Sequence, residues 1–142
     1  MTQNMSAAER RQFLSELHVG VLALNQPGRG PLNVPVWYDY RPGGELWFIT
    51  DRDSRKGKLI AVGTHISLCV QNETPPYQYV SVDGPVVALT PSIVETDLRP
   101  MARRYLGTVQ GDAYTAGAKD GDSMVVRMQC KNWLSVDYSR RA

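Results

Sequence analysis

The sequence predicts a mainly β fold in which six or so antiparallel strands close, or nearly close, into a barrel with a few peripheral helices. Short apolar runs follow one another along the chain, and most are joined by turns without an intervening helix. That order argues against a parallel sheet, in which a helix connects successive strands. Gly84-Pro85 interrupts a long strand-like run, which is typical of a bulge or a barrel corner.

The strands are expected where apolar or alternating residues run between clusters of turn residues. Residues 25–30 (NQPGRG) and 41–44 (RPGG) are two such clusters, and both are rich in Gly and Pro. The expected strands are residues 18–24, 32–40, 46–50, 65–71, 77–89, 123–130 and 133–138.

Two helices are expected before the middle of the chain. Ser6 and Glu9 have the spacing of a capping box, and Phe13 lies on the apolar face of the helix that would follow. A second amphipathic helix is expected over residues 54–62, because Gly63 is a good C-terminal stop.

A third helix is expected over residues 97–106, where Pro100 must lie in the first turn or cause a kink. Arg103 and Arg104 on this helix are expected to be solvated charges. The polar, Gly-containing segment 107–122 is expected to be a loop, either a lid or a simple connection.

Composition indicates one globular domain, residues 1–142, with 42% hydrophobic and 21% charged residues. A net charge of +2 is too small to indicate nucleic acid as a partner, and no apolar run reaches membrane-spanning length. The cytoplasm is the default compartment. Cys69 and Cys130 are expected to be buried free thiols, because no CxxC spacing or histidine partner indicates a metal site.

The segment LWFITDRDSRKGKLI predicts an anion site. A short strand runs into a polar turn, and Ser54, Arg55 and Lys56 then open a helix, whose first N–H groups lack partners and attract anions. Arg adds a fork suited to phosphate oxygens, and Lys adds a point charge. The alternative is a simple Ser N-cap followed by solvated cations. Two cations at a helix N-terminus oppose the helix dipole, however, which favours a bound anion.

Four motifs in order resemble the pyridoxamine-phosphate-oxidase-like superfamily of flavin-binding split β-barrels. They are HVGVLAL, PLNVPVWYDY, ELWFITDRDSRKGKLI and THISLCVQNETPPYQYVSVDGPVVAL. Together they cover about residues 6–89, and the strand followed by SRK is the most specific of them.

This resemblance implies a homodimeric split barrel with a cofactor at the subunit interface. The family's basic pair, here Arg55 and Lys56 beside Ser54, would hold the cofactor phosphate. The second strand, the end of the third strand and the fifth strand would contact the ring or its side chain. The residues implied on those strands are Val34, Pro35, Val36, Trp37, Ile49, Thr50, Gln78 and Tyr79.

Two departures from the oxidases themselves argue against vitamin B6 oxidation. The second strand begins with Leu32-Asn33 where those enzymes have a basic residue, and the chain stops shortly after Trp133 and Tyr138. The short form resembles the deazaflavin-dependent reductases that bind coenzyme F420. Lys56 and Lys58 would suit a phosphate followed by an anionic oligoglutamate tail. FMN remains the alternative cofactor.

No Ser-His-Asp grouping, metal-ligand cluster or Walker-type loop is present, so the sequence identifies no catalytic residue. Cofactor-borne redox chemistry needs none, because the protein chiefly binds and orients the cofactor. The leading hypothesis is an F420-dependent oxidoreductase that transfers hydride to a small, conjugated organic acceptor. The alternatives are an FMN-binding reductase or oxidase of the same fold, and a non-enzymatic binder of a cofactor or haem.

Overall fold

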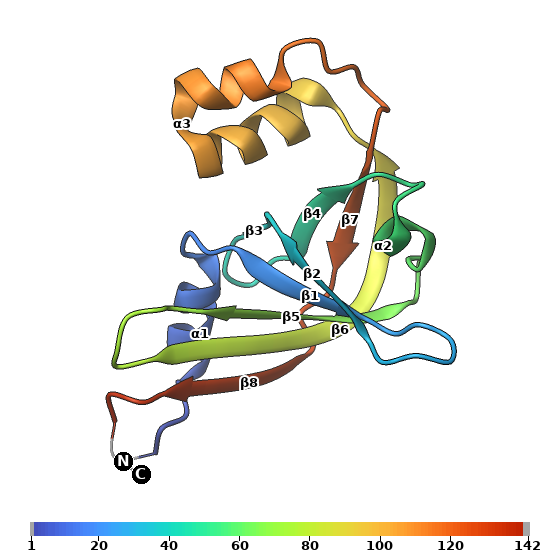
Figure 1. The fold of residues 1–142 in the computed structure, drawn as a ribbon. Coiled ribbons are helices and arrows are strands. Elements are labelled where there is room, and N and C mark those ends of the chain that lie inside the picture. The colour runs from blue at the N-terminus through green and yellow to red at the C-terminus, as the bar shows by residue number, and fades with distance from the viewer. Residues whose placement is uncertain (1, 141–142) are drawn as a thin grey trace.

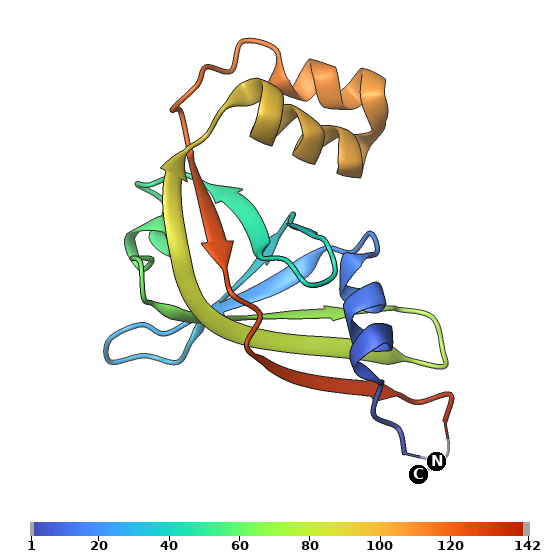
Figure 2. The same ribbon diagram turned by 180° about the vertical axis from the view of Figure 1, so that it is seen from behind.

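The computed structural model describes residues 2–140 and confirms a mainly β split barrel with few helices (Figure 1, Figure 2). Within these residues, eight strands form one curled sheet in which every pairing is antiparallel. The strands are β1 (Gly20–Leu24), β2 (Leu32–Val36), β3 (Asp39–Tyr40), β4 (Leu46–Thr50), β5 (His65–Gln71), β6 (Gln78–Pro91), β7 (Met124–Met128) and β8 (Asn132–Asp137). The helices are α1 (Ala7–Ser15), α2 (Arg55–Lys58) and α3 (Arg99–Thr115), with a π-helix, η1 (Val94–Leu98), directly before α3.

Strand β6 joins the two halves of the barrel. Its first part lies between β5 and β8, and its last part pairs with β7. The register shifts between Val86 and Ala88, immediately after Gly84-Pro85, which confirms the predicted bulge at a barrel corner. Figure 1 shows β6 bending strongly along its length.

The curled sheet brings its own ends together. Its strand order is β2-β1-β5-β6-β7-β4-β3, so it starts and ends on strands that follow each other in the chain. The predicted strand over residues 32–40 is two strands in the structure, β2 and β3, which Trp37 and Tyr38 separate. The chain leaves the ladder there because the Tyr38 N–H is donated to the hydroxyl of Tyr105 on α3.

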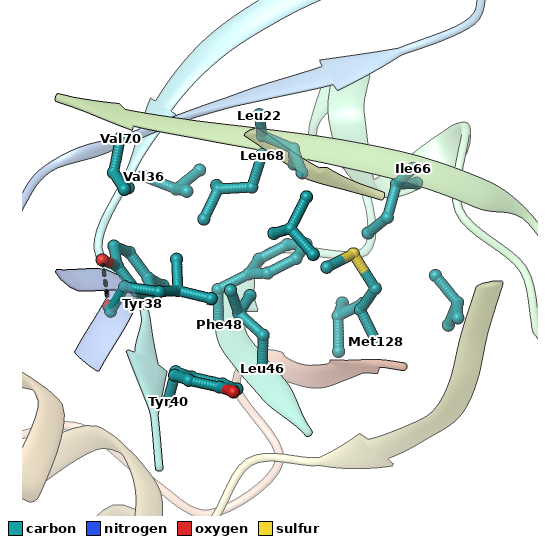
Figure 3. Close-up of a cluster of buried hydrophobic side chains, with 14 of the residues drawn as sticks. Leu22, Val36, Tyr38, Tyr40, Leu46, Phe48, Ile66, Leu68, Val70 and Met128 are labelled. Atoms are coloured by element: carbon teal, nitrogen blue, oxygen red, sulfur yellow. Dashed lines mark hydrogen bonds between the residues drawn. The ribbon is translucent and has the colours of Figure 1, made fainter. Parts of the chain in front are cut away.

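One hydrophobic core fills the barrel (Figure 3). Alternate residues of β1, β4 and β5 point inward, as expected for strands with one buried face. Tyr38 is fully buried, and its hydroxyl donates to the Leu14 carbonyl oxygen at 2.6 Å, which ties α1 to the barrel. The core residues labelled in Figure 3 are Leu22, Val36, Tyr38, Tyr40, Leu46, Phe48, Ile66, Leu68, Val70 and Met128.

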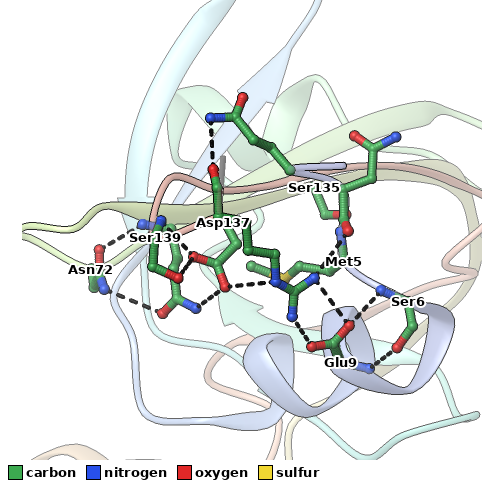
Figure 4. A network of polar contacts seen from close by, with 11 residues as sticks. Met5, Ser6, Glu9, Asn72, Ser135, Asp137 and Ser139 are labelled. Carbon is green, nitrogen blue, oxygen red and sulfur yellow. Dashed lines mark hydrogen bonds and ion pairs between the residues drawn. The ribbon is translucent and has the colours of Figure 1, made fainter. Parts of the chain in front are cut away.

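A polar network joins α1 to the C-terminal strand (Figure 4). The predicted capping box is present, since Ser6 and Glu9 each accept the other's backbone N–H. Arg140 pairs with the Glu9 carboxylate and lies 3.5 Å from Asp137, and the bond from Arg140 lowers the pKa of Glu9 to about 2. The Met5 N–H also reaches the Ser135 hydroxyl, so the start of the chain is held along β8.

The predicted helix over residues 54–62 is wrong in length. The structure has only one turn, α2, capped by Ser54. Buried Gly57 packs so closely that a Cβ on it would lie 2.0 Å from the Asp51 carbonyl oxygen. Ile60 is buried in the core, and the chain then turns at Gly63, so the apolar residues that suggested a longer helix instead anchor a tight loop.

The prediction of a loop over residues 107–122 is wrong for residues 108–115, which are helical, and is confirmed for residues 116–122. Helix α3 continues to Thr115, and it is a hairpin of two helical arms because Gly107 has φ +80° and ψ 173°. Asp112 on the second arm accepts hydrogen bonds from Arg99 and Arg103 on the first. These bonds stabilise a polar second arm that shows little apolar patterning. Figure 1 and Figure 2 show this hairpin standing over one end of the barrel.

Two smaller expectations are corrected. Cys69 is exposed because it lies on the outward face of β5, and Cys130 is half-buried. Neither Arg103 nor Arg104 is simply solvated, since both bond to other parts of the chain. In residues 2–140, none of the helices has the length and apolar character needed to cross a bilayer.

Candidate functional site

A cleft of about 370 Å³ lies between the barrel and the α3 hairpin. It unites residues from segments far apart in the sequence: the ends of β2 and β4, the α2 turn and both arms of the hairpin. Six of the predicted site residues line it, namely Pro35, Val36, Trp37, Ile49, Thr50 and Lys56. The other lining residues are Val19, Asp51, Leu98, Met101, Tyr114 and Ser123.

Trp37 forms an aromatic wall of the cleft. Its ring is stacked on Tyr105 of the first arm, with centroids 5.0 Å apart and planes 5° apart. Tyr114 of the second arm meets it at 5.4 Å, tilted by 49°. The indole therefore lies between the two arms of the hairpin, and its position depends on how the hairpin is attached.

Tyr105 and Arg104 make that attachment. The Tyr105 hydroxyl lies 2.5 Å from the His18 carbonyl oxygen and 3.0 Å from that of Tyr38, and it accepts the Tyr38 N–H. Burial raises the pKa of Tyr105, so the hydroxyl keeps its proton and remains a donor. Arg104 donates to the carbonyl oxygens of Tyr38, Ser15 and Glu16. These bonds hold His18 and Tyr38, the direct neighbours of the cleft residues Val19 and Trp37.

The α2 turn forms the polar side of the cleft. The Ser54 hydroxyl donates to the Asp51 carbonyl oxygen at 2.7 Å, accepts the Gly57 N–H at 3.1 Å and lies 3.2 Å from the Thr50 hydroxyl. The N–H groups that open α2, those of Arg55 and Lys56, have no acceptor within the helix. Lys56 is half-buried and lines the cleft. A cation and free donors therefore meet at this side, as anion binding requires.

A second cavity adjoins this polar side, and Asp51 lines both cavities. Its other walls are Arg52, Asp53, Ser54, Gly121 and Asp122. The Asp51 carboxylate accepts the Ser123 hydroxyl at 2.9 Å, which joins the β4 end to the strand after the hairpin. Anything bound at Ser54 could thus extend from the cleft toward residues 121–122.

The remaining predicted site residues lie outside the cleft. Val34 is half-buried against the core, and Arg55 and Lys58 are exposed on α2. Gln78 lines a different cavity beside α1 and donates to Asp137 at 3.1 Å. Tyr79 lies near Tyr138, with ring centroids 6.4 Å apart.

Sequence reasoning missed six lining residues. Val19 lies in the predicted strand 18–24 and Asp51 directly follows the predicted strand 46–50, and both could have been included on that ground. Leu98 and Met101 lie before the turn at Gly107, whereas Tyr114 reaches the cleft because Gly107 folds the second arm back, which the sequence did not suggest. Ser123 contributes through its bond to Asp51 across 72 positions of sequence.

Solved structures with the same fold include proteins of two cofactor classes by their descriptions. An F420 reductase aligns with TM-score 0.73 and 20% identity, covering 87% of this chain and 94% of its own. A conserved hypothetical protein from Mycobacterium tuberculosis aligns with TM-score 0.76 and 20% identity, covering 97% and 89%. A FAD-binding protein from Mesorhizobium loti aligns with TM-score 0.66 and 20% identity, covering 95% and 94%. At these identities the likeness is one of fold.

Sequence comparison gives the family directly. No curated protein matches this sequence. The family described as pyridoxamine 5'-phosphate oxidase matches residues 6–137, which is nearly the whole chain and includes every residue of the cleft. The chain belongs to the pyridoxamine 5'-phosphate oxidase family.

Proposed function

We propose that this protein is an oxidoreductase that binds F420 in the cleft and transfers hydride from the reduced cofactor to a small organic acceptor. The observation that carries the proposal is the cleft itself. It joins an aromatic and apolar wall, formed by Pro35, Val36 and Trp37, to a cationic side at Lys56, and Ser54 lies next to this side in the adjoining cavity. A flat ring carrying a phosphate has this same division between an apolar body and an anionic end.

The residues of the α2 turn fit a phosphate. Gly57 lets the turn close tightly, because any Cβ there would meet the Asp51 carbonyl oxygen at 2.0 Å. The N–H groups of Arg55 and Lys56 at the start of this turn have no acceptor within the helix, and Lys56 supplies a charge beside them. Asp51 is the one carboxylate among the described lining residues of the cleft, and it is already bonded to Ser123.

When bound, the cofactor would supply the hydride, and the acceptor would gain one proton from solvent to complete its reduction. The chain's own residues would bind the cofactor, orient it and exclude water. Lys56 and Ser54 would hold the phosphate end, while Pro35 and Val36 would support the ring. Trp37 and the hairpin would keep water from the reacting face, since they form the apolar side of the cleft.

The similar structures support a flavin or deazaflavin as the cofactor, and they do not distinguish between the two. Their descriptions name an F420 reductase and FAD-binding proteins on one fold. A flavin is therefore the second candidate, and FMN is the flavin that the sequence analysis left open. A purified protein that is yellow with tightly bound flavin would favour FMN and weaken the F420 proposal.

The proposal includes a homodimer formed through the outer face of the sheet. Val21 and Leu134 on this face are 43% and 56% exposed, and Cys69 between them is exposed too. Cross-strand pairing puts these residues in one row, Pro35–Val21–Cys69–Ser81–Leu134. Pro35 also lines the cleft, and Tyr79 lies on the same face as Ser81. A second copy on this face would bring the partner's Tyr79 toward the cleft.

Val21→Asp tests the dimer. A charge at the centre of an apolar interface is costly to bury, so the variant is expected to be a monomer at concentrations where the wild type is a dimer. Light scattering measures the mass. Val62→Asp is the matched control, because Val62 is 64% exposed and lies between α2 and β5, outside the row. A Val21→Asp protein with the mass of the wild type would rule out this face as the interface.

A turnover assay tests the enzymatic part of the proposal. Reduced F420 is mixed without oxygen with the protein and a panel of enones and quinones, and oxidation of the cofactor is followed by absorbance. The expected result is many cofactor molecules oxidised per protein with at least one acceptor. A protein that binds the reduced cofactor tightly but oxidises none of it across the panel would instead be a non-enzymatic carrier.

A further inference from the structure

Trp37 has two aromatic neighbours that are held very differently. Tyr105 lies parallel to the indole at 5.0 Å, whereas Tyr114 is tilted by 49° at 5.4 Å. Tyr114 and Trp37 both line the cleft, and Tyr105 does not. The indole is thus stacked from behind by one ring, and a second, inclined ring stands beside it on the cleft side.

Tyr105 cannot move without breaking the fold locally. Its hydroxyl bonds to the carbonyl oxygens of His18 and Tyr38 and accepts the Tyr38 N–H. Arg104 lies over its ring at 5.8 Å and donates to Tyr38 as well. Trp37 therefore presents a fixed plane to the cleft.

Tyr114 is held at its backbone and free at its ring. Its arm of the hairpin is fastened through Asp112, which accepts from Arg99 and Arg103, and Thr115 accepts from Arg99. The Tyr114 side chain is 59% exposed, and among residues 2–140 nothing hydrogen-bonds to its hydroxyl. The ring can therefore rotate about its side-chain torsions while its Cα stays at the cleft.

Building on the proposed function, we infer that Tyr114 selects the electron acceptor. A flat, uncharged, conjugated molecule stacks on the cleft side of the fixed plane of Trp37, and the adjustable ring of Tyr114, now 5.4 Å from the indole, turns aside to cover it. Aromatic pairs favour offset-stacked or edge-to-face geometries at 4.5–7 Å between centroids, and a single rotation of Tyr114 offers either. The neighbouring cleft residues, Leu98 of η1 and Met101 of α3, are apolar, so a flat acceptor meets no competing charge from this side.

The test uses two probes that share a carbon skeleton and a hydroxyl but differ in flatness, 2-naphthol and decahydro-2-naphthol. Their dissociation constants are measured by calorimetry on protein loaded with oxidised cofactor. The wild type is expected to bind 2-naphthol about two- to tenfold more tightly than the puckered probe. Tyr114→Leu should remove this preference, and Tyr114→Phe should keep it because the ring is retained.

Val109→Ala is the matched control, because Val109 is 84% exposed on the hairpin and does not line the cleft. It should behave as the wild type. The affinity for the cofactor, measured on the same variants, should change by less than about twofold. Equal binding of the two probes by the wild type, a preference that survives Tyr114→Leu, or a loss of cofactor affinity in that variant would each overturn the inference. A wild type that binds no cofactor would instead refute the proposed function.

Discussion

Lys56→Ala is expected to weaken cofactor binding by about 1.5–3 kcal/mol, which is about ten- to 150-fold in dissociation constant. Lys56 is half-buried at the polar side of the cleft, next to the free N–H groups of the α2 turn. A charge-assisted bond to phosphate is stronger there than on an open surface, because less water screens it. Fluorescence titration of the cofactor-free variant measures the change.

Two variants separate this effect from a general loss of positive charge. Lys131→Ala removes a charge from an exposed residue outside the cleft and should leave the affinity unchanged. Lys58→Ala removes an exposed charge on the same turn, and should weaken F420 alone if the oligoglutamate tail runs along it. Wild-type affinity in a correctly folded Lys56→Ala protein would contradict the phosphate assignment.

Gly84→Ala is expected to destabilise the whole fold by about 3 kcal/mol or more. A Cβ on Gly84 would lie 1.7 Å from the Gln129 carbonyl oxygen, and the clash is with backbone that a side-chain rotation cannot relieve. The site is the corner where β6 exchanges its partners, so the strain would fall on both halves of the barrel. The midpoint of thermal unfolding should fall by about 6–12 °C, which calorimetry or circular dichroism measures.

Gly30→Ala is the matched control for this prediction. No heavy atom lies within 4 Å of the position that its Cβ would take, so its unfolding midpoint should stay close to that of the wild type. A Gly84→Ala protein as stable as the wild type would show that the corner can open, and that β6 is not held there as tightly as its contacts indicate.

The fold was predictable from the sequence where the pattern is local. Residues 46–50 and 65–71 were predicted as strands with the bounds that β4 and β5 have in the structure, because apolar alternation and flanking turn residues define both. The length of α2 was not predictable in this way. What ends it is the contact of Gly57 with the Asp51 carbonyl oxygen and the burial of Ile60, neither of which follows from residue spacing.

The prediction of a loop in place of the second arm of the α3 hairpin failed for a different reason. Its second arm is polar and begins after Gly107, which are features of a loop. It is helical because Asp112 bonds to two arginines of the first arm, and because Gly111 approaches the backbone of Arg103 closely enough that a Cβ would lie 2.8 Å away. These contacts connect positions 8 to 13 residues apart across a turn. Helix periodicity relates residues only three or four positions apart, so it does not predict them.

For the candidate site, the family resemblance supplied the residues on β2, β4 and α2, and the cleft contains half of the twelve residues proposed to bind the cofactor. The side formed by the hairpin, including Tyr114, followed only from the three-dimensional arrangement. Gln78 and Tyr79 lie away from the cleft of their own protomer, so their proposed role depends on the second copy.

A paired titration of the cofactor-free protein with F420 and FMN, followed by fluorescence, tests the central proposal most directly. The proposal predicts tight binding of F420, weaker binding of FMN, and loss of F420 affinity in Lys56→Ala. Tight binding of FMN with weak binding of F420 would make the protein a flavoprotein of the same family. Binding of neither cofactor would contradict the proposed function while leaving the fold and the family unchanged.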